Sequence, residues 1–210
     1  FKLLGLHRFV VFQATDSGEA EEIKHHFRQD ATIIGNAPAS LPEVHEITPK
    51  KPNELRLITV CRITSRKNVL GLYQILKQVS PEYKIHHTLI GPIEEKSYWN
   101  EVQQVCKDLG EHIEYIHCGP LPKPLVADEL QKAHAKIYPT LGENFGHTIF
   151  EAMTHGKPLI ISDLTPWKDL KELKIGWDLP VNDQAGFVLA IESLAAMDQE
   201  EYNRMSASSR

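Results

Sequence analysis

The sequence predicts an α/β fold, a doubly wound and mainly parallel sheet with helices on both faces. Between residues 55 and 180, short apolar runs rich in β-branched residues alternate with stretches whose apolar residues have a helical period. Alternation at this spacing favours right-handed βαβ units and therefore a parallel sheet. Ligands of such sheets bind at the carboxyl ends of the strands, near the point where the strand order reverses.

The elements follow from these signals in chain order. The run 55–63 (LRLITVCRI) indicates a buried strand, and apolar residues spaced helically from Val69 to Val79 indicate a helix over 67–79. The next helix, over 95–110, is predicted to end at Gly110. The remaining predicted elements are strands at 83–91, 112–119, 135–139 and 158–162, and helices at 124–134, 147–155, 166–173, 183–196 and 199–208.

The first 54 residues have a different pattern. Residues 1–36 carry the signals of one strand, one helix and a second strand, which is too little to fold alone. Residues 37–54 contain four prolines and little periodicity, which indicates a linker. The predicted main domain is then 55–198, followed by a terminal helix at 199–210.

Composition excludes several classes of protein. The chain has 210 residues, 41% of them hydrophobic, which suits a sizeable core. A net charge of −5 argues against a general nucleic-acid partner. No apolar run approaches the roughly 18 residues of a membrane span. The three cysteines and eleven histidines lack metal-ligand spacing, so we expect reduced thiols, no structural metal and a cytoplasmic protein.

The stretch GENFGHTIFEAMTHGKPLIISD, residues 142–163, contains two glutamates eight positions apart, Glu143 and Glu151. The helix between them is predicted to end at Gly156, because Pro158 cannot continue it. Its apolar side carries Ile149, Phe150 and Met153, and its other side carries His147, Glu151 and His155. The simpler interpretation is a solvated Glu151 and a Glu143 that complements the positive end of the helix.

The alternative interpretation is a ligand site at the helix start. The amides near Phe145, Gly146, His147 and Thr148 have no partner inside the helix, and Gly146 has no side chain to keep a ligand away. Such a helix start suits a phosphate. The ionised glutamates on either side would accept hydrogen bonds from hydroxyl groups. A phosphate flanked by two polyols describes a nucleotide sugar.

A pair of cations supports the ligand site. Arg62 and Lys67 lie five residues apart, at the end of the first predicted strand and the start of its helix. A bidentate guanidinium and a mobile ammonium would neutralise a diphosphate, and we expect Arg62 to contribute more. Two solvated cations are the alternative, and Arg66 is a competing candidate for the same role.

Five segments together resemble the donor-binding half of glycosyltransferase family 4, which has the two-domain GT-B fold. They are CRITSRKN, TLIGP, IEYIHCGPLP, YPTLGENFGHTIFEAMTHGKPLIISD and GWDLPVND, and the resemblance covers about 55–208. Residues 1–36, especially NAP, are similar to the last segment of the family's N-terminal acceptor domain. The helix from about 199 is similar to the one that crosses back to that domain.

The resemblance implies roles for individual residues. Arg62 and Lys67 would bind the donor diphosphate and Glu143 the hydroxyls of the transferred sugar, so these three would carry catalysis. The remaining donor contacts would be Glu151 to the ribose, the backbone at Phe145, Gly146, His147 and Thr148 to phosphate, and the loop from Gly119 to Leu121 to the base. The sequence departs from the family at His147, at Asn68 and in TPWKDL after Asp163.

The resemblance also implies a reaction. The family is metal-independent, needs no cofactor and retains anomeric configuration, and we assign no nucleophile. The expected activity is transfer of a sugar from a nucleotide diphosphate to a glycan or lipid-linked acceptor, in bacterial surface-polysaccharide synthesis. The acceptor would bind through the N-terminal domain, of which 1–36 would be a remnant, so we expect this chain alone to be inactive. Peripheral association of the full-length protein with the inner face of the membrane would fit such acceptors.

Two other functions remain open from the sequence. A GT-B nucleotide-sugar epimerase would need acid and base residues that the sequence does not identify. A non-catalytic module would bind a nucleotide sugar without turning it over. Analysis of the product, a new glycoside, an epimer or nothing, separates the three.

Overall fold

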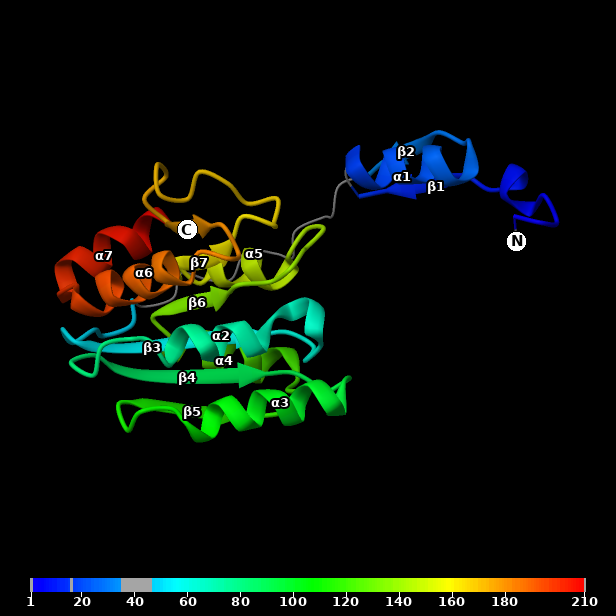
Figure 1. Cartoon of the computed structure of the whole chain (residues 1–210). Helices are drawn as coiled ribbons and strands as arrows, with labels where there is room; N and C mark the ends of the chain where they lie inside the picture. Colours follow the sequence, from blue (N-terminus) through cyan, green and yellow to red (C-terminus); the bar gives the residue numbers. More distant parts are fainter. Residues whose placement is uncertain (1, 16, 35–46, 210) are drawn as a thin grey trace. The chain divides into compact units, whose positions relative to one another are not determined.

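The computed structural model describes residues 2–15, 17–34 and 47–209 (Figure 1). The chain divides into two compact units, Phe1–Ala39 and Ser40–Arg210, and each is described by itself. The predicted linker spans their boundary, and its residues 37–46 lie outside the described residues.

The larger unit is built on a six-stranded parallel sheet, which confirms the predicted fold class. The strand order is β5-β4-β3-β6-β7-β8, so the chain proceeds outward from β3 in one direction and then outward from β6 in the other. The strands are β3 (Glu54–Val60), β4 (Lys84–Ile90), β5 (Ile113–His117), β6 (Ala135–Tyr138), β7 (Leu159–Ser162) and β8 (Gly176–Leu179). The reversal point therefore lies between β3 and β6.

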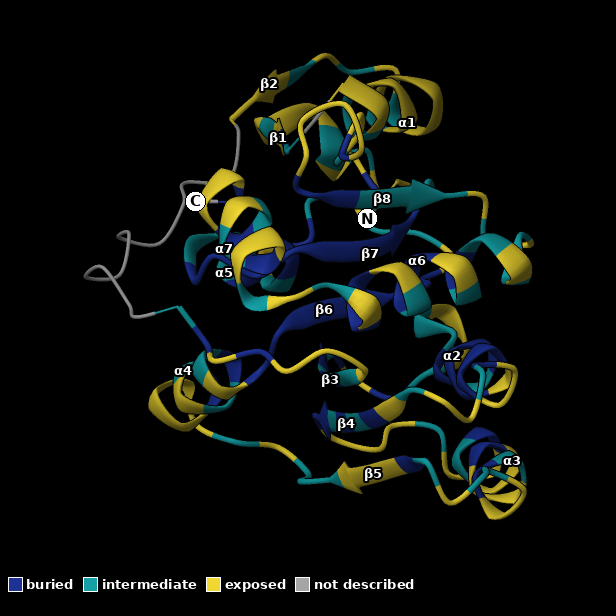
Figure 2. Ribbon diagram, turned by 90° about the vertical axis from the view of Figure 1, so that its left-hand side faces the viewer, coloured by how far each residue is buried: buried dark blue, intermediate teal, exposed yellow. Residues whose placement is uncertain are grey.

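Helices cover both faces of the sheet. On one side are α2 (Val69–Leu76), α3 (Lys96–Lys107) and α6 (Gln184–Ala196), and on the other α4 (Lys123–Lys132), α5 (His147–Thr154) and α7 (Gln199–Ser208) (Figure 2). A short 3-10 helix, η2 (Ser65–Lys67), precedes α2. The central strands β6 and β7 are buried along their whole length. Burial of each large apolar side chain stabilises the fold by about 1.5–3 kcal/mol.

The segment between β7 and β8 differs from the prediction. Residues 166–169 are irregular and 170–173 form turns, so the predicted helix is absent. Asp169 has a φ of 59°, which a helix cannot contain, and the Asp178 carboxylate accepts hydrogen bonds from the amides of Asp169 (3.2 Å) and Leu170 (3.0 Å). The four-residue strand β8 was not predicted, because GWDL is too short to show a period.

The described part of the predicted linker, residues 47–53, packs onto the larger unit. Thr48 and Lys50 are buried there. The Lys50 ammonium donates to the carbonyls of Ala195 (2.7 Å) and Lys51 (2.8 Å), and the Thr48 hydroxyl donates to the carbonyl of Gln131 (2.7 Å). These bonds fix the chain where it enters β3.

The smaller unit contains η1 (Leu6–Phe9), β1 (Phe12–Ala14), α1 (Ser17–Phe27) and β2 (Ala31–Ile33). Its two strands pair in parallel, so the predicted strand, helix and strand are present. The Phe12 and Phe27 rings stack with centroids 4.9 Å apart. Its assignment as part of an acceptor domain stays a prediction.

Candidate functional site

A cavity of about 240 Å³ lies at the reversal point of the sheet, at the carboxyl ends of β3 and β6. This is where doubly wound sheets bind ligands. The residues that line it are Val60, Cys61, Arg62, Lys67, Tyr138, Glu143, Gly146, His147 and Thr148. Both predicted cations, the first glutamate and the start of α5 therefore meet at one place, although they are up to 86 positions apart in the sequence.

Glu143 is the centre of a three-residue polar cluster at this cavity. Its Oε2 accepts hydrogen bonds from the Lys67 ammonium (2.7 Å) and from the Tyr138 hydroxyl (2.8 Å). The Lys67 and Glu143 side chains are only 13% and 19% exposed. A part-buried, charge-assisted pair of this kind is stronger than an ion pair on the surface.

Tyr138 lines the cavity, and the sequence analysis did not predict it there. Burial raises the pKa of its hydroxyl above the usual value, and Cys61 and Glu143 raise it further. The hydroxyl therefore stays protonated and donates to Glu143. No motif marks it, because in the sequence it is one more apolar residue of a buried strand.

The two arginines near the cavity differ in position. Arg62 lines the cavity, and its guanidinium pairs with Glu94 at 3.1 Å, with the two side chains 65% and 40% exposed. Exposed pairs of this kind contribute little to stability, so this arginine is available to a ligand. Arg66 does not line the cavity, and its side chain lies against Gly142. Lys67, rather than its competitor Arg66, occupies the inward position.

Gly146 sets the start of α5. Its φ is 79°, a left-handed conformation that favours glycine, and a Cβ here would lie 2.8 Å from the Ile149 Cδ1 atom. No side chain caps this helix end. Because Gly146, His147 and Thr148 all line the cavity, the positive end of α5 is at its wall, where an anion would be stabilised.

The segment after β7 holds the loop that carries Glu143. The Glu143 amide donates to the carbonyl of Leu164 (3.1 Å), and the Trp167 indole N–H donates to the carbonyl of Phe145 (2.7 Å). The Phe145 and Trp167 rings also meet edge to face at 5.8 Å. Leu164 and Trp167, the second of which belongs to the unusual TPWKDL sequence, thus hold the loop at Glu143 and at Phe145.

Asn68 joins the connection after β3 to the connection after β6, and residues of both connections line the cavity. It has a φ of 52°, which asparagine tolerates better than most residues, and its side-chain amide donates to the carbonyl of Pro139 at 2.8 Å. This hydrogen bond therefore ties the start of α2 to the end of β6. This accounts for asparagine at one of the positions where the sequence departs from the family that it resembles.

Several predicted residues lie outside the cavity. Phe145, Glu151, Gly119 and Leu121 do not line it. Glu151 is half-buried on α5, and Gly119 lies at the end of β5, where its carbonyl accepts from the Gly91 amide at 2.9 Å. Their predicted contacts with ribose and base stay predictions. His155, expected on the side of α5 away from the apolar face, is instead buried at the end of that helix.

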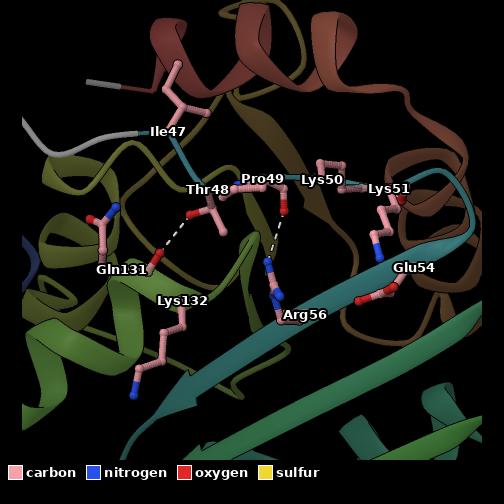
Figure 3. A pocket seen from close by; sticks show the side chains of 9 residues that line it. All are labelled: Ile47, Thr48, Pro49, Lys50, Lys51, Glu54, Arg56, Gln131 and Lys132. Carbon is pink, nitrogen blue, oxygen red and sulfur yellow. Dashed lines mark hydrogen bonds between the residues drawn. The ribbon is translucent and has the colours of Figure 1, made fainter.

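A larger cavity of about 470 Å³ lies at the opposite edge of the sheet, beside the start of β3 (Figure 3). Its lining residues are Ile47, Thr48, Pro49, Lys50, Lys51, Glu54, Arg56, Gln131 and Lys132. Arg56 donates to the carbonyl of Pro49 at 2.9 Å, and Lys50 is bonded to backbone carbonyls, so two of its cations already serve the fold. It also lies away from the edge where such sheets bind ligands.

Within residues 2–15, 17–34 and 47–209, no three or more His, Cys, Asp or Glu side chains gather as a metal site would require. None of the described helices is long and apolar enough to span a bilayer.

The fold and the site define a class, a doubly wound α/β domain with two cations at a cavity at its reversal point. The family model for glycosyl transferases group 1 matches residues 41–210, and the chain belongs to this family. A D-inositol 3-phosphate glycosyltransferase of Paenarthrobacter aurescens (strain TC1) is 22% identical over 165 residues. That match covers 72% of this chain and 40% of the relative.

Solved structures of GT-B glycosyltransferases share the fold. WaaG, a glycosyltransferase involved in lipopolysaccharide biosynthesis, matches with a TM-score of 0.73 and 12% identity, over 94% of this chain and 56% of its own. TarM of S. aureus, in complex with Fondaparinux, alpha-GlcNAc-glycerol and UDP, matches with a TM-score of 0.68 and 14% identity, over 99% of this chain and 42% of its own. The chain thus spans about half of the length of these proteins.

Proposed function

We propose that the larger unit is the donor-binding half of a retaining glycosyltransferase of the family 4 type. It would bind a nucleotide diphosphate sugar for transfer to a glycan or lipid-linked acceptor in surface-polysaccharide synthesis, at the cytoplasmic side of the membrane. Family membership supports the class of reaction, and the UDP in the TarM structure makes a uridine nucleotide the first ligand to test.

One observation carries the proposal. Lys67, Glu143 and the start of α5 converge on a single cavity at the reversal point of the sheet. A diphosphate there would meet the free amides at the start of α5 and two cations, Arg62 and Lys67. Glu143 has a second carboxylate oxygen with no hydrogen bond among the described residues, so it could accept one from a sugar hydroxyl.

The same arrangement supports metal-independent chemistry. Two positive side chains and a helix end would stabilise the charge that develops on the leaving diphosphate, which is the role that a divalent cation has elsewhere. We assign no nucleophile and propose that the leaving phosphate assists the incoming hydroxyl on the same face. A chelator should therefore leave transfer by the full-length protein unchanged.

A thermal-shift panel tests the donor proposal. The purified chain is heated with UDP, GDP, ADP and dTDP and with sugars of each nucleotide. A ligand at one hundred times its Kd stabilises by about 2.7 kcal/mol, which raises the Tm by several degrees. A shift that is specific for one base, and absent in Lys67→Ala, is expected. If no nucleotide at millimolar concentration shifts the wild-type chain, the proposal is wrong.

We further propose that the 210-residue chain binds donor but transfers no sugar by itself. It spans only 40% of the length of its curated relative, and positioning of the acceptor supplies about 7–11 kcal/mol of catalysis in well-oriented reactions. A radiolabelled-donor assay with the full-length protein as the positive control tests this. Transfer by the chain at the full-length rate would contradict the two-domain assignment.

A further inference from the structure

Lys136 is a buried cation that the proposed site does not use. It lies in β6, its side chain is 0% exposed, and its ammonium finds no hydrogen-bond acceptor among the residues that the structure describes. A buried ammonium without a partner costs much free energy, whereas an apolar residue in the middle of a buried strand costs none. Its presence needs a reason other than the packing of the core.

The position of Lys136 relates it to the cavity. It is two residues before Tyr138 on the same strand, so both side chains lie on one face of the sheet. Its Nζ is 4.8 Å from the centroid of the Tyr138 ring, and Tyr138 lines the cavity. The ammonium therefore lies behind the cavity wall. A cation–π contact of this kind offsets only part of the desolvation cost.

The charges around Lys136 belong mostly to the candidate site. Burial lowers its pKa to about 8, while Cys61, Glu151 and Glu143 raise it and Lys67 lowers it. Both predicted glutamates, Glu143 and Glu151, thus favour the charged form of Lys136. His87 of β4 also lies in its field, but burial lowers the pKa of that imidazole to about 3, so it is neutral at pH 7.

We propose that Lys136 is a buried counter-charge of the donor site, a third cation that strengthens binding of the donor diphosphate from behind Tyr138. This inference rests on the proposed function. When Lys67 turns from Glu143 to a phosphate, the carboxylate loses its ion pair, and the ammonium of Lys136 remains to balance it. Because Lys136 is fully buried, the attraction is screened less than it would be in water.

Lys136→Met tests the proposal through two readouts that move in opposite directions. Methionine fills a similar volume without charge, so the ligand-free variant should unfold at a temperature roughly 2–4 °C higher than wild type. Its affinity for UDP, or for the nucleotide that the thermal-shift panel selects, should fall about tenfold at pH 7 in calorimetric titration. Unchanged affinity in a folded variant would overturn the proposal.

Lys157→Met is the matched control. Lys157 is also buried, at 1% exposure, but its ammonium donates to the Thr48 hydroxyl (2.6 Å) and to the Gln131 carbonyl (3.1 Å), at the other edge of the sheet. Its replacement should lower the Tm and leave nucleotide affinity unchanged. If Lys136→Met behaves like this control, Lys136 has a structural role only.

The pH dependence of nucleotide affinity gives a third readout. Because the charged form of Lys136 binds the anion better, wild-type affinity should weaken between pH 7 and pH 9, as the ammonium loses its proton. Lys136→Gln keeps a polar side chain at this position, and its nucleotide affinity should lose most of this pH dependence. The pH dependence that remains in the variant gives the contribution from titration of the ligand. An equal slope in both proteins would contradict the proposal. A wild-type chain that binds no nucleotide would overturn the proposed function and this inference together.

Discussion

Glu143 accepts hydrogen bonds from two donors of different chemistry, an ammonium and a phenol, through the same oxygen. The carboxylate is therefore fixed in orientation before any ligand arrives. Preorganised polar groups avoid the cost of reordering when a substrate binds. When Lys67 turns to a phosphate, the Tyr138 hydroxyl would still hold the carboxylate in this direction for a sugar hydroxyl.

Tyr138→Phe removes the phenol donor and keeps the ring. We expect the affinity for the nucleotide sugar to fall by about threefold to tenfold, because Glu143 loses one modest hydrogen bond that positions it. The affinity for the nucleotide alone should stay unchanged, because the phosphate contacts are elsewhere. Parallel titrations with UDP and a UDP-sugar measure this ratio. An equal loss for both ligands would show that Tyr138 supports the whole cavity instead.

Arg62→Ala and Lys67→Ala should each weaken nucleotide diphosphate binding. Loss of one charge-assisted contact costs about 1.5–3 kcal/mol, which is a factor of roughly 10 to 150 in Kd. Arg66→Ala is the matched control, since this neighbouring cation faces Gly142 and does not line the cavity. Wild-type affinity in both of the first two variants, measured by calorimetry, would remove the diphosphate role, and the order of their losses tests the larger contribution expected from Arg62.

At the scale of elements, the strand-to-helix connection after β6 is the part of the site under most conformational constraint. It contains Gly146 in a left-handed conformation, and it is held by the Leu164 carbonyl and the Trp167 indole. The first turn of α5 therefore has one orientation relative to Glu143. The proposed contacts to the diphosphate and the proposed contacts to the sugar both depend on this connection.

Gly146→Ala should destabilise the chain and weaken nucleotide binding. The left-handed conformation costs an alanine about 1–2 kcal/mol, and its Cβ would also press on Ile149. Gly119→Ala separates the two effects, because Gly119 has a φ of 66° but open space around it. Urea unfolding should show the larger loss in Gly146→Ala. Similar losses in both variants would indicate that only the backbone conformation matters.

The sequence predicted the elements that carry a long signal and missed those that do not. Gly156 and Pro158 ended α5 correctly, because breakers act locally. The predicted helix at 166–173 failed because the carboxylate of Asp178, which lies outside it on β8, accepts hydrogen bonds from two of its amides instead. Periodicity cannot report a partner that only tertiary structure brings near.

The same limit applies to the candidate site. Arg62, Lys67, Glu143 and Gly146 could be predicted, because their types and spacing have a chemical meaning within one or two elements. Tyr138, Lys136 and Trp167 could not, since their roles depend on contacts across the sheet or between loops. The sequence treated the first two as part of a buried strand.

At the scale of the whole molecule, a buried polar chain joins three strands and a helix. The Thr59 hydroxyl donates to the carbonyl of Ile137 (2.7 Å), so the His87 Nε2–H donates to Thr59 (3.0 Å) and its Nδ1 accepts from the Tyr73 hydroxyl (3.1 Å). This arrangement fixes a neutral imidazole. A second buried histidine, His134, has its pKa lowered to about 3, chiefly by burial.

These two histidines predict that acid destabilises the larger unit. Each has a pKa near 6.5 when unfolded and about 3 when folded, so the unfolded chain binds more protons between those values. Stability is therefore complete above pH 6.5 and is lost as the pH falls toward 3. At pH 5 each group should cost about 2 kcal/mol. Urea unfolding at intervals between pH 7 and pH 5 measures the slope.

His87→Gln should remove about half of this slope, because glutamine can still hydrogen-bond to its neighbours but does not titrate. The variant will be less stable at pH 7, since the buried chain from Tyr73 to Ile137 is disturbed, so the slope and not the absolute value is the relevant quantity. His25→Gln, at an exposed position of α1, should leave the slope as it is in wild type. If His87→Gln instead keeps the wild-type slope, acid acts through carboxylates, and the neutral imidazole assigned to His87 is wrong.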